Sequence, residues 1–160
     1  MIKYASFYFG FLLLSGLPTL AQNDSILSRI VLIGDAGELQ GKKNAVVEAV
    51  RKSVTLDKKT SILFLGDNVY PNGLPDEFNS AYNELKSILD TQITIGRGTD
   101  AKVFMVPGNH DWDNGSPAGY EYILREANYV NSAGLKNVFF YPESGCPGPV
   151  EISIGKEITL

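Results

Sequence analysis

The sequence predicts an α/β fold with a parallel β-sheet, and two observations carry that prediction. Short apolar runs rich in β-branched and aromatic residues occur at 30–33, 62–65 and 103–106, and a glycine follows each within two residues. Runs of this kind are typical of buried parallel strands. Stretches with helical spacing separate the runs, so the order strand–helix–strand–helix–strand favours right-handed crossovers within one sheet.

Strands are expected wherever such runs occur, and the sequence places six of them. They cover Arg29–Ile33, Thr60–Leu65, Lys102–Val106, Val138–Tyr141, Pro149–Ile154 and Glu157–Leu160. The last run reaches the end of the chain without a turn or cap. Because a strand that stops in this way leaves a sheet incompletely paired, we expect residues 22–160 to be the N-terminal portion of a longer, truncated domain.

Three helices are expected, at 42–55, 76–89 and 120–130, and Asp76 is the expected N-cap of the second. In the first two helices, apolar residues recur at helical spacing and should face the sheet. They are Ala45, Val46, Ala49, Val50 and Val54 in the first helix, and Phe78, Tyr82, Leu85 and Leu89 in the second.

Residues 1–21 predict a cleavable signal peptide. Lys3 gives a positive start, an apolar stretch runs to Leu17, and small residues precede a cut between Ala21 and Gln22. A membrane anchor is the alternative, but a spanning helix needs about 20 apolar residues, and this stretch is shorter and interrupted by glycine and proline. We therefore expect a secreted or periplasmic protein without stable membrane insertion.

The composition excludes several function classes. The net charge is −4 and no basic run is present, so no nucleic-acid partner is expected. Cys146 is the only cysteine and cannot form a disulfide within the chain, nor does it stand at the cut as a lipid anchor would require. Because the chain has only one histidine, no second histidine is available to activate Cys146 as a nucleophile.

Oxygen donors and the single histidine follow the three central runs. They are Asp35, then Asp67 and Tyr70, then Asn109 and His110. Ligands of open α/β sheets collect beyond the carboxyl ends of the strands, so we expect these groups to converge. Two cations about 3.5–4 Å apart at such a point could clamp a phosphate and activate a water molecule. Aspartate and asparagine are also common turn formers, so each position alone is weak evidence.

Three segments carry a family resemblance: Asp35-Ala36-Gly37, Gly66-Asp67-x-x-Tyr70 and Gly108-Asn109-His110-Asp111. They resemble the first three sequence blocks of the calcineurin-like metallophosphoesterases, and the tyrosine makes them most similar to the purple acid phosphatase branch. The resemblance implies half of a metallophosphoesterase α/β sandwich. It also implies an acid phosphatase-like phosphomonoesterase that attacks phosphorylated small molecules or phosphoproteins with a metal-bound hydroxide.

The resemblance also implies a metal ligand set of four residues. Asp35 and Tyr70 would ligate the first metal ion, usually Fe3+. Asp67 would bridge both ions. Asn109 would ligate the second ion, a divalent zinc, manganese or iron.

Three further residues receive roles beside the metals. His110 would stabilise the phosphoryl transition state or protonate the leaving group. Asp111 would help to orient His110, and Asn68 is a candidate for contact with the phosphate.

The chain departs from the family pattern after His110. The family adds histidine ligands in two later blocks, and this sequence has no further histidine. A site without these histidines has too few ligands to bind a divalent metal ion tightly. We therefore expect the chain as it stands to be inactive, and its partner to be the C-terminal remainder of the same protein.

Two other functions compete with this hypothesis. A non-catalytic exported binding module on the same fold is the alternative, and the reading frame beyond Leu160 would discriminate between the two. A nucleotide-binding module is excluded because residues 34–43 fail the phosphate-loop template at Ala36 and Lys43.

Overall fold

A four-stranded parallel sheet forms the centre of the computed structural model, which describes residues 25–144, 148–155 and 158–160. Neighbouring strands pair in sequence order and all in parallel. They are β1 (Arg29–Ile33), β2 (Thr60–Phe64), β3 (Lys102–Met105) and β4 (Val138–Phe140). This architecture confirms the predicted α/β class and is consistent with half of an α/β sandwich.

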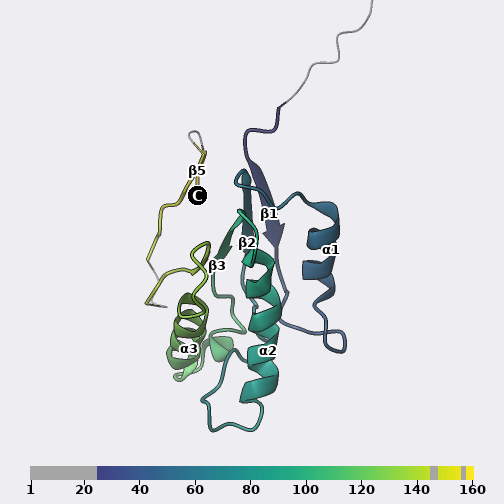
Figure 1. Ribbon diagram of the computed structural model, residues 1–160. Helices are drawn as coiled ribbons and strands as arrows, with labels where there is room; N and C mark the ends of the chain where they lie inside the picture. The colour runs from purple at the N-terminus through teal and green to yellow at the C-terminus, as the bar shows by residue number, and fades with distance from the viewer. Residues whose placement is uncertain (1–24, 145–147, 156–157) are drawn as a thin grey trace, which may run out of the picture.

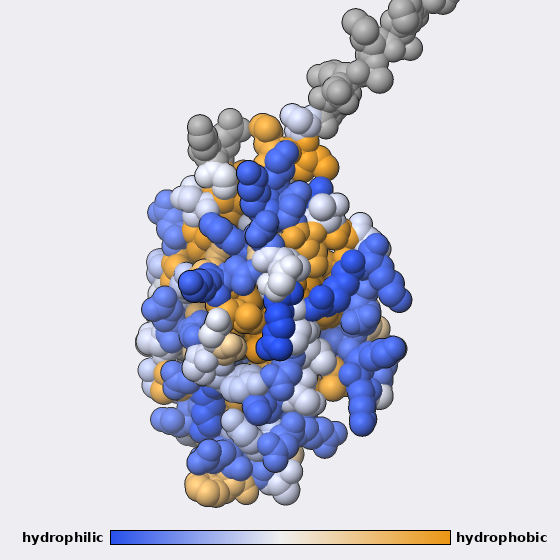
Figure 2. All heavy atoms as spheres, viewed as in Figure 1, coloured by the Kyte–Doolittle hydropathy of each residue, from blue (hydrophilic) through white to orange (hydrophobic). Residues whose placement is uncertain are grey.

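Three helices cover one face of this sheet (Figure 1). They are α1 (Ala45–Ser53), α2 (Tyr82–Ile93) and α3 (Gly119–Asn131), with short 3-10 turns η1 (Thr94–Gly96) and η2 (Asp113–Gly115). The strands present aligned side chains to this face, because Ile33, Phe64, Met105 and Phe140 lie side by side in the register. These residues share one core with buried side chains of all three helices. The outward surfaces of the helices are mainly hydrophilic (Figure 2).

The predicted start of the second helix is wrong. α2 begins at Tyr82, and Asp76 belongs to a preceding turn in which its carboxylate accepts a hydrogen bond from the Phe78 backbone N–H. The Phe78 side chain is 90% exposed instead of buried. The helix also continues to Ile93, beyond the predicted end at Leu89.

The first helix is shorter than predicted and turned about its axis. Asn44 caps it, because the Asn44 side-chain oxygen accepts a hydrogen bond from the Val47 N–H at 3.1 Å. Val47 is buried, whereas Val46, which was expected to face the sheet, is exposed.

The second face of the sheet carries apolar side chains that no helix of the described residues covers. Leu32 is 61% exposed and Leu65 is 49% exposed. On the neighbouring strands, the aromatic rings of Phe104, Phe139 and Tyr141 stack on one another. An apolar sheet face of this kind is typical of a surface that packs against another layer.

The C-terminal strands are much shorter than predicted. β5 (Ser153–Ile154) and β6 (Ile158–Thr159) pair with each other in antiparallel fashion, apart from the main sheet. The predicted signal peptide and Cys146 lie outside the described residues. Over the part of the chain that is described, none of the helices combines the length and apolar character that a membrane crossing requires.

Candidate metal and phosphate site

The loops after β1 and β2 turn sharply at their aspartates. Asp35 has a φ of 53° and Asp67 a φ of 55°, the left-handed region that non-glycine residues seldom occupy. Glycines lie beside both turns, and the backbones at Gly66 and Gly108 pass in close contact. These turns bring the two carboxylates to the carboxyl edge of the sheet, where ligands collect in α/β folds.

The Tyr70 hydroxyl joins the two carboxylates. It lies 2.7 Å from Asp35 Oδ1 and 3.2 Å from Asp67 Oδ2. These neighbours keep the hydroxyl protonated, because the hydrogen bond to Asp35, burial and the hydrogen bond to Asp67 all raise the pKa of Tyr70. The structure thus brings Asp35, Asp67 and Tyr70 together at one point. The proton between two carboxylates occupies a place where a cation would be favoured.

His110 lies next to this group. Its backbone N–H donates to Asp67 Oδ1 at 3.1 Å, and its ring meets the Tyr70 ring edge-on, with centroids 4.6 Å apart. The ring atom Nδ1 lies 2.7 Å from the Pro71 carbonyl oxygen. Because a carbonyl can only accept, Nδ1 must carry the proton, which leaves Nε2 as the second reactive position of the ring.

Asn109 is not joined to the same group by a hydrogen bond of the described residues. Its side chain is exposed and its amide nitrogen donates to Asn114 Oδ1 at 3.2 Å. Its position directly before His110 keeps it near Asp67. Its role as a metal ligand stays a prediction.

Comparison with known proteins decides the family. The family model of the calcineurin-like phosphoesterases matches residues 28–154, which include all three loops. The chain belongs to this family. No curated protein and no solved structure matches it. The protein is therefore a phosphoesterase-type hydrolase at the level of the superfamily, whose members generally use two metal ions.

The donor chemistry of this calcineurin-like phosphoesterase fits part of such a centre. Asp35, Asp67 and Tyr70 offer hard oxygen ligands at one point, as oxygen-preferring cations require. Within residues 25–144, 148–155 and 158–160, no three histidine, cysteine, aspartate or glutamate side chains group closely enough to hold a metal ion. The described side chains thus offer only part of the donor set that such a centre needs.

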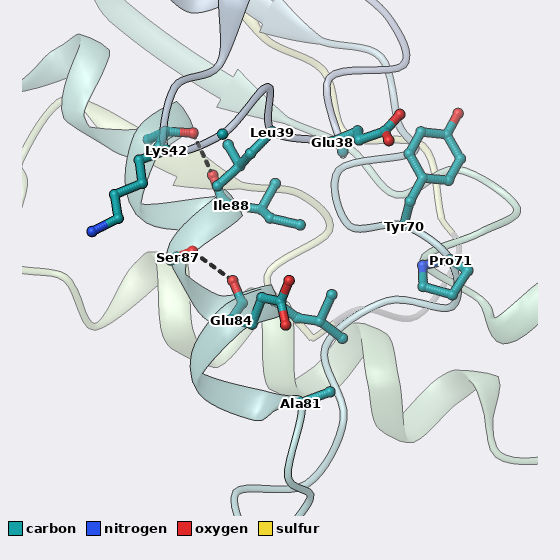
Figure 3. A pocket seen from close by; sticks show the side chains of 13 residues that line it. Glu38, Leu39, Lys42, Tyr70, Pro71, Ala81, Glu84, Ser87 and Ile88 are labelled. Carbon is teal, nitrogen blue, oxygen red and sulfur yellow. Dashed lines mark hydrogen bonds between the residues drawn. The ribbon is translucent and has the colours of Figure 1, made fainter.

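A cleft opens beside the carboxylates of the phosphoesterase. Its volume is about 930 Å³, and it lies between the loop after β1 and helix α2. Figure 3 shows Tyr70 at its margin, with Leu39 and Ile88 on the apolar wall and Glu38 and Glu84 among the polar groups. Tyr70 therefore belongs both to the carboxylate cluster, through its hydroxyl, and to the cleft, through its ring.

Asp111 takes a different place from the one expected. It is buried, and its carboxylate accepts hydrogen bonds from the backbone N–H groups of Gly108 at 2.7 Å, Asn68 at 2.9 Å and Val69 at 3.0 Å. No hydrogen bond of the described residues joins it to the His110 ring, which does not fit the predicted orienting role. Burial raises the pKa of Asp111 although these hydrogen bonds lower it. Asp111 ties the loop after β2 to the loop after β3.

Asn68 is also buried, which does not fit the predicted contact with phosphate. Its side-chain amide donates to the Val106 carbonyl at 2.8 Å and to Asp111 Oδ2 at 3.1 Å. Both donors are therefore used within the fold, and Asn68 supports the loop that carries Asp67.

Two buried amides support the site and were missed by the sequence analysis. The Gln92 amide on α2 donates to the Ala36 carbonyl at 3.0 Å and to the Asn68 carbonyl at 2.7 Å. The Asn44 amide donates to the same Ala36 carbonyl at 2.7 Å. Gln92 lies at helical spacing from Ile88 and Leu89 and so shares their buried face. This spacing would have indicated Gln92 if the predicted helix had continued past Leu89.

Gly108→Ala is expected to destabilise the protein and displace the Asp67 carboxylate. A Cβ atom at this position would lie 2.3 Å from Asp67 Oδ1 and 2.4 Å from the Asp67 backbone nitrogen. We expect urea unfolding to show a loss of about 1–3 kcal/mol, as for other overpacked positions. Gly34→Ala is the matched control, because it also precedes a site residue but its Cβ would meet nothing within 4 Å. Equal stability of the two variants would contradict the prediction.

Proposed function

We propose that this phosphoesterase hydrolyses phosphate monoesters in the manner of the purple acid phosphatase branch. The observation that carries the proposal is the Tyr70 hydroxyl held between Asp35 and Asp67 at the carboxyl edge of the sheet. A phenol beside two carboxylates is a ligand set suited to a strongly polarising cation such as Fe3+.

The residues divide between two ions. Asp35 and Tyr70 would hold Fe3+, Asp67 would bridge, and Asn109 would hold a divalent zinc, manganese or iron. When bound, the ions supply the positive charge that neutralises the phosphate and lowers the pKa of a water molecule. The proton of Tyr70 has to leave for this ligation, and the raised pKa of Tyr70 means that a cation must drive its release.

His110 would act on the leaving-group side of the phosphate, as a proton donor or a hydrogen-bond donor. Its Nδ1 is engaged by the Pro71 carbonyl, so Nε2 is the ring atom left for the substrate. When the ring carries a second proton, Nε2 can donate it to the leaving oxygen or can donate a hydrogen bond to the phosphoryl group. The cleft beside Tyr70 has room for the organic part of a phosphorylated small molecule or a phosphorylated side chain of a protein.

The proposal includes a partner and a location. The C-terminal remainder of the same protein would pack on the sheet face that carries Leu32 and Leu65 and would add the histidine ligands. Without it, the chain of 160 residues would bind metal weakly and show no appreciable turnover. The predicted signal peptide would direct the protein to a secreted or periplasmic location, with no nucleic-acid partner.

Asp67→Asn is expected to reduce hydrolysis of an aryl phosphate by at least about a hundredfold, because it weakens the bridge to both ions. The assay uses the protein with its remainder, in the presence of Fe3+ and a divalent ion. Asp100→Asn, the same change in an exposed loop, should leave the rate unchanged.

Equal rates of wild type and Asp67→Asn would rule out the bridging role. Metal binding without any hydrolysis would favour the non-catalytic binding module instead. Appreciable turnover by the chain of 160 residues alone would contradict the need for the remainder.

A further inference from the structure

Two adjacent residues of α3 hold both backbone groups of one buried residue, Leu74. The Arg125 Nε donates to the Leu74 carbonyl at 2.8 Å, and the Leu74 N–H donates to Glu126 Oε1 at 3.0 Å. Leu74 and Glu126 are both fully buried. Burial raises the pKa of Glu126 well above its usual range, and the nearby Asp111 charge raises it further. We call Arg125 and Glu126 the Leu74 clamp.

Leu74, the residue that the clamp holds, lies three residues after Pro71, the hydrogen-bond partner of His110. Leu74 ends the short turn that begins at Pro71, and the Pro71 carbonyl accepts the hydrogen bond of His110 Nδ1. Gly73, between them, has no free space. A Cβ atom there would lie 2.7 Å from the Asp111 carbonyl oxygen and 2.9 Å from Glu126 Oε1. The turn is therefore held at Leu74 and packed at Gly73, which leaves the Pro71 carbonyl little freedom to move.

We propose that Arg125 and Glu126 are positioning residues for His110. By fixing Leu74, they hold the Pro71 carbonyl where it accepts the proton on Nδ1, and so determine that Nε2 is the ring atom available to the substrate. Neither residue touches the reacting atoms. The control of the His110 tautomer stands on its own, whereas its consequence for catalysis rests on the proposed function.

The test measures the tautomer of His110 by 15N NMR at a pH where the imidazole is neutral. The sample is the chain of 160 residues, in which His110 is the only histidine, so its ring signals need no assignment against others. Wild type should show the Nδ1-protonated form as the dominant one. In Arg125→Met and Glu126→Met, the Nε2-protonated form should become substantial. Glu126→Gln keeps an oxygen that accepts from the Leu74 N–H, so this variant should show the same tautomer as wild type.

Asn131→Ala provides a matched control on the same helix. Asn131 holds Phe140 by the same pattern, since its side chain accepts from the Phe140 N–H at 2.9 Å and donates to the Phe140 carbonyl at 3.3 Å. Its loss removes a comparable clamp at the end of β4 and should leave the His110 tautomer unchanged. A tautomer shift as large as that of the clamp variants would show a general loosening and overturn the proposal.

Kinetics of the protein with its remainder give the second readout. General acid–base catalysis contributes about 10²–10⁴-fold, so a misplaced His110 should lower kcat at least about tenfold while KM changes little. An unchanged tautomer in Arg125→Met overturns the proposal, even where Glu126→Met fails to fold. Absence of hydrolysis in wild type would instead count against the proposed function and leave the tautomer result decisive.

Discussion

Asp111→Ala is expected to reduce the free energy of unfolding by at least about 3 kcal/mol, a loss that few single substitutions reach. The carboxylate is the acceptor for the buried N–H groups of Asn68 and Val69 and for the partly buried N–H group of Gly108. Each buried donor left without a partner costs about 1–3 kcal/mol. The alanine variant no longer buries a carboxyl group, and this gain offsets part of the loss. The expected value therefore lies below the sum of three such penalties.

Urea unfolding followed by circular dichroism measures this effect. Asp111→Asn is the matched variant, because it keeps the shape and one acceptor oxygen but turns an amide donor toward backbone donors. It should fall between wild type and alanine. A loss below about 1 kcal/mol for Asp111→Ala would show that water replaces the carboxylate and that Asp111 does not tie the loops together.

The stability of the wild-type protein is expected to fall as the pH rises above the range of ordinary carboxyl groups. Glu126 has a pKa raised well above the reference value of 4.5, first because it is buried and then because of the Asp111 charge. Above the unfolded-state pKa, the folded protein keeps a proton that the unfolded chain releases. Each pH unit within this window therefore costs up to about 1.4 kcal/mol, and the decline ends once the folded pKa is passed.

Glu126→Gln should remove this part of the pH dependence. Glutamine is uncharged at every pH and keeps an acceptor for the Leu74 N–H. Urea unfolding at a series of pH values should therefore show the variant gaining stability relative to wild type as the pH rises. Glu143→Gln, a change at an exposed carboxyl group, should run parallel to wild type. A constant difference between Glu126→Gln and wild type would mean that Glu126 ionises normally in the folded protein.

The strands of the main sheet could be predicted because their signal is local and strong. An apolar run such as 62–65, short and directly followed by Gly66, is typical of a strand in a parallel sheet. Helix α2 was harder, because Asp76 is a good cap in sequence but its carboxylate instead closes a turn at Phe78. In α1, the neighbouring pair Val46 and Val47 allows two registers of the apolar face, and only packing against the sheet decides between them.

The meeting of the strand-end carboxylates could be predicted for a similar reason. Asp35 and Asp67 follow parallel strands, so the fold class alone brings them to one edge. The supports could not be predicted. The partner of the His110 ring is a backbone carbonyl, and since every residue has one, the sequence does not mark it. Glu126 belongs to a helix that follows all three motifs in the chain. Asp111 was assigned to its sequence neighbour, His110, although its carboxylate bonds to backbone N–H groups 42 and 43 residues earlier.

At the left-handed turns of Asp35 and Asp67, backbone stability and the proposed function favour different residues. A glycine adopts that conformation at lower cost than any residue with a Cβ atom. It would also relieve the crowding of two carboxylates around one hydroxyl. The substitutions that would most relax the backbone here are therefore the ones that delete the proposed metal ligands. A sequence selected for thermal resistance alone would drift toward glycine at both positions, and the aspartates persist only while something other than stability requires them.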